Sequence, residues 1–139
     1  RSCIKGIDEE AVTHNAEILK MQFATEIDFL RNARPYYQYG KLLITHAGFD
    51  STAENWQDTS NQDFLWIREH YLQPNQTGLI NIFGHTPTRN MHKIDDIWIS
   101  PCQSYIGIDG GCAYGGQLNA LLISEQGEIL EMFVEHSDK

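Results

Sequence analysis

Two histidines that each follow a largely apolar run are the residues of this chain best suited to chemistry. Residues 42–45 form the first run, which ends at His46, and residues 79–84 form the second, which ends at His85. In open α/β sheets, ligands bind beyond the carboxyl ends of the strands, and a neutral imidazole is the commonest metal ligand in proteins. We therefore expect His46 and His85 to be metal ligands. The alternative is that each histidine is only satisfied by hydrogen bonds near a strand end.

The predicted elements that position these histidines alternate between helix and strand. A helix is expected from residue 8 to about residue 33, because apolar residues recur there at helical spacing, and Pro35 ends it. Its apolar positions are Val12, Ala16, Leu19, Phe23, Ile27 and Leu30. Residues 36–39 are expected to be a connector. A second helix is expected between the N-cap residue Ser60, with Asp63 completing a capping box, and Pro74.

From Lys93 onward the hydrophobic pattern changes to a period of two, which is typical of strands. Strands are expected over 97–100, 105–108, 118–124 and 129–134, with Gln126-Gly127 turning the last two into a hairpin. Together with the strands before the two histidines, the sequence predicts an α/β domain that ends in an antiparallel meander.

Composition and charge favour a soluble globular domain. The chain has 139 residues, 41% of them hydrophobic and 21% charged, and a net charge of −9. This charge argues against binding to nucleic acid or to an anionic membrane surface, since phosphate contacts need clustered Lys and Arg. No segment has the roughly 20 apolar residues that span a bilayer. Cys3, Cys102 and Cys112 are expected to be free thiols, which predicts a cytoplasmic protein.

Five short segments in the same order resemble the calcineurin-like metallophosphoesterases, and in particular the bacterial serine/threonine protein phosphatases. They are Thr45-His46-Ala47-Gly48, Phe64-Leu65-Trp66-Ile67-Arg68-Glu69, Gly84-His85-Thr86-Pro87, Gly107-Ile108-Asp109-Gly110-Gly111-Cys112 and Gly115-Gly116-Gln117-Leu118-Asn119-Ala120-Leu121. The resemblance covers the chain from about Phe29 to its end. It implies a two-sheet α/β sandwich.

The resemblance also implies the roles of individual residues. The family hydrolyses phosphoesters with a hydroxide that bridges two divalent ions, and its two late histidines match His46 and His85. Its phosphate-binding arginine matches Arg68, whose planar guanidinium suits phosphate oxygens; the alternative is an exposed Arg68 that pairs with Glu69. Asp109 is expected either to orient a metal-binding histidine or to cap a turn. Manganese is the expected metal, with iron, nickel or zinc as alternatives.

Three family segments that carry the other metal ligands and the catalytic histidine have no counterpart, because the chain contains no Gly-Asp dipeptide and its only Gly-His is Gly84-His85. We therefore expect residues 1–139 to be the C-terminal part of one domain whose N-terminal metal-binding part is absent. This fragment is expected to hold no catalytic residue and to be inactive alone. The complete enzyme is expected to dephosphorylate phosphoserine or phosphothreonine in proteins, with the missing N-terminal half as its intramolecular partner.

Two other functions stay open from the sequence. One is hydrolysis of diadenosine tetraphosphate on the same fold, which loops 50–60 and 88–96 would decide. The other is a non-catalytic interaction module. Among the remaining residues with chemical potential, His14, His70, His92 and His136 are expected at the surface, Cys112 is expected to be a small neutral side chain, and the glycine pairs 110–111 and 115–116 are expected to form tight turns.

Overall fold

The computed structural model describes residues 9–124 and 126–136. The chain divides into two compact units, residues 1–34 and residues 35–139. In the described ranges, no helix combines the length and the apolar character that crossing a membrane requires.

The first unit contains two helices where the sequence predicts one. Helix α1 (Glu9–Gln22) and helix α2 (Ala24–Arg31) are separated at Phe23, whose φ of −119° and ψ of 34° interrupt the helical backbone. The predicted first residue, Asp8, lies outside the described residues. The apolar side chains of the predicted stripe are largely exposed, and α2 has no buried residue. The prediction of helical structure in this range is therefore confirmed, whereas the prediction of one continuous helix is wrong.

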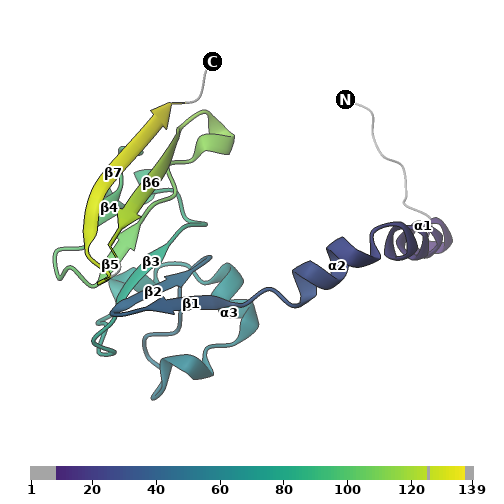
Figure 1. Ribbon diagram of the computed structural model, residues 1–139, viewed down its shortest axis with the longest axis horizontal. Helices are drawn as coiled ribbons and strands as arrows, with labels where there is room; N and C mark the ends of the chain where they lie inside the picture. Colours follow the sequence, from purple (N-terminus) through teal and green to yellow (C-terminus); the bar gives the residue numbers. More distant parts are fainter. Residues whose placement is uncertain (1–8, 125, 137–139) are drawn as a thin grey trace. The chain divides into compact units, whose positions relative to one another are not determined.

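The second unit is built on a five-stranded mixed sheet with the order β1-β2-β3-β5-β4 (Figure 1). Its strands are β1 (Tyr36–Tyr39), β2 (Leu42–Thr45), β3 (Ile80–Phe83), β4 (Trp98–Ile99) and β5 (Tyr105–Gly107). The three central strands β2, β3 and β5 run parallel, and the two edge strands are antiparallel to their neighbours. Two further strands, β6 (Gln117–Ile123) and β7 (Ile129–His136), form a separate antiparallel sheet. The α/β class is thus confirmed, with two sheets.

Two predictions about the strands are wrong. Residues 36–39 form strand β1 and not a connector, because Gly40, at a φ of 56°, turns the chain so that Tyr39 pairs with Leu42. The continuous antiparallel meander is not formed either, because β5 pairs in parallel with β3 and the following hairpin belongs to the other sheet. The hairpin itself is confirmed, with Gly127 in the turn at a φ of 83°.

The short helices lie in the connections of the second unit. They are α3 (Asn61–Trp66) and α4 (Arg89–His92), with the single 3₁₀ turns η1 (Trp56–Asp58), η2 (His70–Leu72) and η3 (Cys112–Tyr114). The cap predicted at Ser60 is confirmed, because its Oγ accepts a hydrogen bond from the Asp63 N–H at 3.0 Å. The helix ends at Trp66, well before Pro74, because Ile67 already has an extended backbone with a ψ of 140°.

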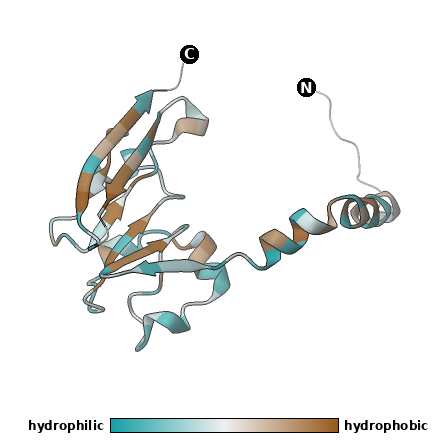
Figure 2. Cartoon of the chain, viewed as in Figure 1, coloured by the Kyte–Doolittle hydropathy of each residue, from teal (hydrophilic) through white to brown (hydrophobic). Residues whose placement is uncertain are grey.

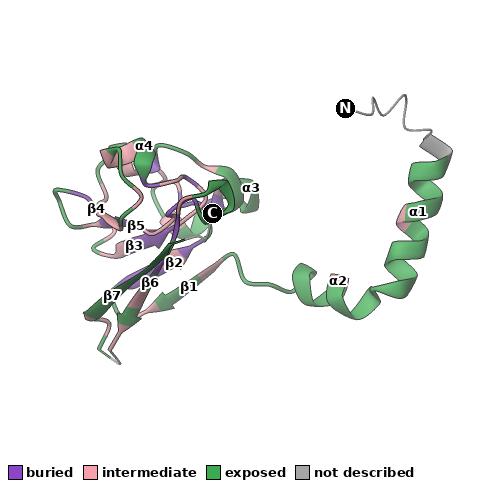
Figure 3. Cartoon of the chain, turned by 90° about the horizontal axis from the view of Figure 1, so that it is seen from above, coloured by how far each residue is buried: buried purple, intermediate pink, exposed green. Residues whose placement is uncertain are grey.

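Apolar side chains cover both faces of the five-stranded sheet. On one face, Leu43, Phe83 and Tyr105 pack with residues of the connections, including Phe49 and Phe64. On the other face, the core residues are Leu42, Ile82 and Ile106, and the hairpin side chains Leu121, Ile123 and Ile129 pack against them. Figure 2 shows the hydrophobic residues along these strands, and Figure 3 shows that the buried residues gather on the central strands. This packing fixes the strand ends that carry the candidate site.

Candidate metal and phosphate site

The two predicted histidines meet at the carboxyl edge of the parallel strands. His46 follows β2 directly, and His85 follows β3 after one glycine. Since β2 and β3 are parallel neighbours, their carboxyl ends lie at the same edge of the sheet. The Gly84 N–H donates a hydrogen bond to the His46 carbonyl at 2.9 Å, and the two imidazole centroids are 5.1 Å apart. The structure therefore brings together the pair that the sequence singled out.

The backbone holds His85 in an uncommon conformation. Its φ is 65°, in the left-handed region that non-glycine residues rarely occupy. The Thr86 N–H donates to the Gly84 carbonyl at 2.7 Å, which closes a three-residue turn around His85. The Trp66 and His85 rings are perpendicular to each other, with centroids 5.4 Å apart. Strained residues of this kind cluster at functional sites, where the surrounding structure holds them in place.

Charges and burial keep the His85 imidazole neutral. Burial lowers the pKa of His85 most, and the Arg68 charge and then His46 lower it further, whereas the Asp109 carboxylate acts in the opposite direction. The Nε2 atom of His85 is buried and has no hydrogen-bond partner within the described residues. A neutral imidazole with an unpaired buried nitrogen fits the requirements of a metal ligand.

The described part of the chain supplies this pair without further ligands. No group of three or more His, Cys, Asp or Glu side chains among the described residues is placed to hold a metal ion. His46 is exposed and His85 is partly buried, so the pair is open on one side. The arrangement fits two nitrogen ligands of one metal site and leaves the remaining ligands unassigned.

Arg68 lies beside this pair but not on a helix, which differs from the prediction. Helix α3 ends at Trp66, and Arg68 follows two residues later as an exposed residue of the connection. Its charge lowers the pKa of His85, so the guanidinium acts on that histidine. In the described ranges Arg68 forms no salt bridge, so the pairing with Glu69 considered from the sequence is not made. Its guanidinium donors remain available to an anion.

Asp109 caps a turn at the same edge of the sheet. It follows β5 by two residues, and its Oδ1 accepts a hydrogen bond from the Gly111 N–H at 2.9 Å. This turn-capping role is the second of the two roles expected from the sequence. Gly111, at a φ of 65°, and Gly115, at 77°, confirm that the glycine pairs form tight turns. The Asp109 charge opposes part of the lowering of the His85 pKa, which places the carboxylate near the site.

His70 is the residue that sequence reasoning misplaced. It was expected at the surface, yet it is only 4% exposed and packs against Phe49, Phe83 and Tyr105. Its Nε2 lies 3.0 Å from the Asn81 Oδ1, and burial lowers its pKa from 6.5 to about 4. A signal was present in the sequence, because an Asn within the apolar run of β3 needs a buried hydrogen-bond partner.

The other chemistry-bearing residues agree with their predictions where the structure describes them. His14 and His136 are exposed, and His92 is half-buried at the surface with its Nε2 bonded to the Asp96 carbonyl at 3.0 Å. Cys102 and Cys112 are exposed free thiols, whereas Cys3 lies outside the described residues. Hydrogen bonds from the hydroxyls of Ser100 and Ser104 lower the pKa of Cys102 to about 7.

Comparisons with models of protein families, with curated proteins and with solved structures gave no match for this chain.

Proposed function

We propose that this chain forms the C-terminal part of a metal-dependent phosphoesterase that removes phosphate from phosphoserine or phosphothreonine in proteins. The observation that carries the proposal is the convergence of His46 and His85 from adjacent parallel strands, with ring centroids 5.1 Å apart. The unpaired, buried Nε2 of His85 supports it, since this atom needs a partner that the described residues do not provide. The resemblance in sequence agrees with this reading of the site.

The protein's own residues have separate tasks in this proposal. His46 and His85 would hold one of two divalent ions, of which Mn²⁺ is the first choice and Fe, Ni or Zn the alternatives. The depressed pKa of His85 keeps its lone pair available at neutral pH. Arg68 would bind phosphate oxygens through its planar set of donors. The ions would supply an attacking hydroxide at neutral pH and positive charge for the phosphate.

The test uses the full-length protein that carries this chain, with Mn²⁺ present. Turnover of p-nitrophenyl phosphate and of a phosphoserine peptide is measured together with bound metal, determined by mass spectrometry. His46→Ala and His85→Ala are each expected to lose one equivalent of metal and most of the turnover. His92→Ala serves as the matched control, since the hydrogen bond of this surface histidine within the described residues goes to the backbone carbonyl of Asp96.

Three outcomes separate the alternatives. Unchanged metal content in both site variants would refute the metal role of the two histidines. A wild-type protein without bound metal or turnover would favour a non-catalytic interaction module. Faster hydrolysis of diadenosine tetraphosphate than of the phosphopeptide would favour a nucleotide hydrolase on the same site.

A further inference from the structure

Arg68 and His70 lie on either side of a bend in the chain. Arg68 is exposed and its charge acts on His85, whereas His70, two residues later, is only 4% exposed. Between them Glu69 has a φ of 61° and a ψ of 8°, in the left-handed region that non-glycine residues rarely occupy. Such a conformation persists only where the surrounding structure holds it. Residues 67–70, called the Arg68 segment below, therefore need an anchor.

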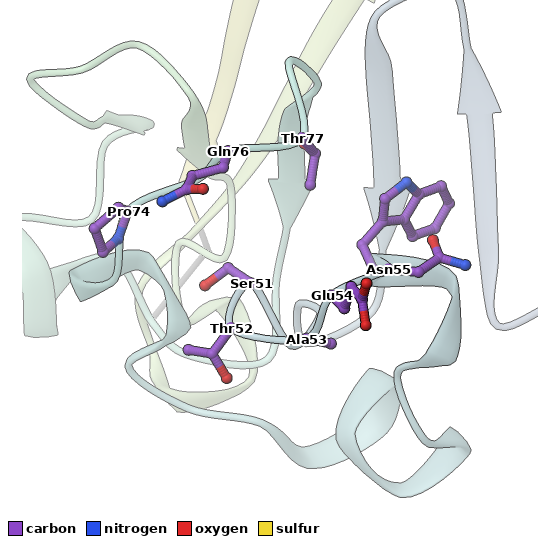
Figure 4. A pocket seen from close by; sticks show the side chains of 9 residues that line it. Ser51, Thr52, Ala53, Glu54, Asn55, Pro74, Gln76 and Thr77 are labelled. Carbon is purple, nitrogen blue, oxygen red and sulfur yellow. The ribbon is translucent and has the colours of Figure 1, made fainter.

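The backbone and the packing around the Arg68 segment supply little of this support. Among the described residues, the N–H groups of Arg68 and Glu69 donate to no backbone carbonyl. The segment borders a hollow of about 340 Å³. A separate hollow of about 600 Å³ lies between residues 51–56 and residues 74–77, which follow η2 (Figure 4). Open space thus borders the segment and the residues that come after it, and the buried end at His70 is its anchor.

A hydrogen bond to Asn81 fixes His70 in the core. The Asn81 Nδ2 donates to the Leu43 carbonyl at 2.9 Å and to the Thr45 hydroxyl at 3.0 Å, which directs the Asn81 Oδ1 toward His70. The His70 Nε2 lies 3.0 Å from this oxygen, so Nε2 carries the proton of the neutral ring. All four residues are buried. Breaking this bond is unfavourable, because it would leave the Asn81 oxygen as an unpaired buried acceptor.

The same network reaches the other part of the candidate site. The bond from Asn81 to Thr45 holds the residue directly before His46. The His70 ring also fills the space that a Cβ on Gly48 would occupy, two residues after His46. The strand end that carries one metal-ligand candidate and the Arg68 segment are thus held by one buried pair of polar side chains.

Packing alone does not account for a histidine at this position. The ring lies among Phe49, Phe83 and Tyr105, which would surround an apolar ring equally well. His70 instead has a second nitrogen, Nδ1, which is buried and has no hydrogen-bond partner among the described residues. An unpaired buried polar atom opposes stability, whereas two buried polar partners replaced by apolar groups can leave stability nearly unchanged. The pair is therefore better explained by what it holds in place.

We propose that His70 is a positioning residue, whose hydrogen bond to Asn81 holds Arg68 beside the histidine pair. This inference rests on the proposed function, which assigns phosphate binding to Arg68. A bidentate contact between guanidinium and phosphate requires one orientation of the guanidinium, and a misplacement of about 1 Å can lower a rate about a hundredfold. His70 supplies this orientation through the backbone of the Arg68 segment, without touching the substrate.

The first measurement is hydrogen exchange of the full-length protein, prepared without metal and analysed by mass spectrometry. His70→Phe keeps an aromatic ring but loses the donor to Asn81. The N–H groups of Leu72 and Gln73, which donate to the Glu69 and His70 carbonyls at 2.9 and 3.0 Å, should exchange at least about tenfold faster in this variant. His70→Gln keeps a donor for Asn81 and should exchange like the wild type. His70→Leu replaces His70→Phe if the larger ring prevents folding.

Ile106→Val is the control for general destabilisation. Ile106 is buried in the core on the other face of the sheet, so the loss of one methyl group there weakens the fold without touching the pair. This control should leave exchange of the Arg68 segment and of η2 near the wild-type rate. Unchanged exchange there in His70→Phe, or a similar increase in Ile106→Val, would overturn the inference.

The second measurement separates positioning from a purely structural role. In the full-length protein with Mn²⁺, His70→Phe should lower kcat/KM for p-nitrophenyl phosphate at least about tenfold while the bound metal is unchanged. His70→Gln should restore the wild-type value. In an Arg68→Ala background, His70→Phe should have no further effect, because the residue that it positions is gone. A further loss of the same size in that background would overturn the inference.

The proposed function fails on different results. A wild-type protein without bound metal or turnover would refute it, and hydrogen exchange would still decide whether His70 holds the Arg68 segment. Wild-type kinetics of Arg68→Ala would refute phosphate binding by Arg68. A loss of kcat/KM in Arg68→Ala without any loss in His70→Phe would refute the positioning role of His70 alone.

Discussion

Acidification is expected to destabilise this protein through His70. The pKa of His70 in the folded protein is about 4, whereas the unfolded chain has the ordinary value of 6.5, so the unfolded state binds more protons between these values. Stability is then complete above pH 6.5 and falls as the pH decreases toward 4. At pH 4 the unfolded residue is almost fully protonated and the folded one half protonated, which corresponds to a loss of about 3 kcal/mol.

The structure explains why protonation is so unfavourable. The ring is surrounded by Phe49, Tyr71, Phe83 and Tyr105, and its hydrogen bond among the described residues goes to the neutral amide of Asn81. Among the described residues no carboxylate shifts its pKa, so a charged imidazolium would be buried there without a counter-ion.

The assay is urea unfolding of the chain followed by circular dichroism from pH 7.5 to pH 4. The matched comparison is His70→Gln, because glutamine keeps a hydrogen-bond donor for Asn81 and does not titrate. The difference in unfolding free energy between the two proteins cancels the contributions of the other titrating groups. This difference should shrink by about 3 kcal/mol between pH 7 and pH 4, with about half of the change above pH 5.2. A difference that does not change with pH would refute the burial of a neutral His70.

Three further predictions concern other parts of the second unit. Gly48→Ala should lower the free energy of unfolding by roughly 3 kcal/mol, because φ is 147° there and an added Cβ would lie within 2.6 Å of ring atoms of His70. Gly78→Ala is the control, at a φ of 72° with open space around it, and should lower the free energy of unfolding by only about 1 kcal/mol. In the full-length protein, His46→Ala and His85→Ala should each lower the affinity for Mn²⁺ by at least about tenfold, while the melting temperature stays near that of the wild type. Calorimetric titration with Mn²⁺ measures this affinity, and an unchanged value would contradict the assignment. Arg68→Lys should lower kcat/KM for p-nitrophenyl phosphate by about tenfold or more with normal metal content, since it keeps the charge but loses the bidentate geometry; wild-type kinetics would make Arg68 an ordinary surface cation.

The sequence predicted the strands in which every residue is covered, on whichever face of the sheet it lies. Strands β2 and β3 are central and parallel, so they are covered on both faces and appear as continuous apolar runs. The histidines that follow them are placed correctly for the same reason. Strand β1 was missed because Tyr36, Tyr37, Gln38 and Tyr39 form an edge strand with exposed central residues, and such a segment resembles a connector.

Long-range pairing was not readable from the pattern of residues. Alternation of apolar and polar residues identified β4, β5, β6 and β7 as strands, but alternation carries no information about the partner strand. Strand β5 lies beside β3, so the chain returns to the middle of the first sheet before it forms the hairpin of the second. The burial of His70 was missed for a related reason, since its partner Asn81 lies 11 residues further along the chain.

The conformation of His85 links the fold to the candidate site. A φ of 65° costs a non-glycine residue roughly 1–2 kcal/mol, and glycine at this position would avoid that cost. The chain has glycine next to it, at Gly84, yet carries an imidazole at the strained position itself. At this position the ring centroid lies 5.1 Å from that of His46, and Nε2 is buried without a hydrogen-bond partner among the described residues. A buried unpaired nitrogen and a strained backbone both oppose stability, so a structural role alone does not account for this residue. A ligand at the histidine pair would account for both, so the proposed metal binding by His46 and His85 is the first property of this protein to measure.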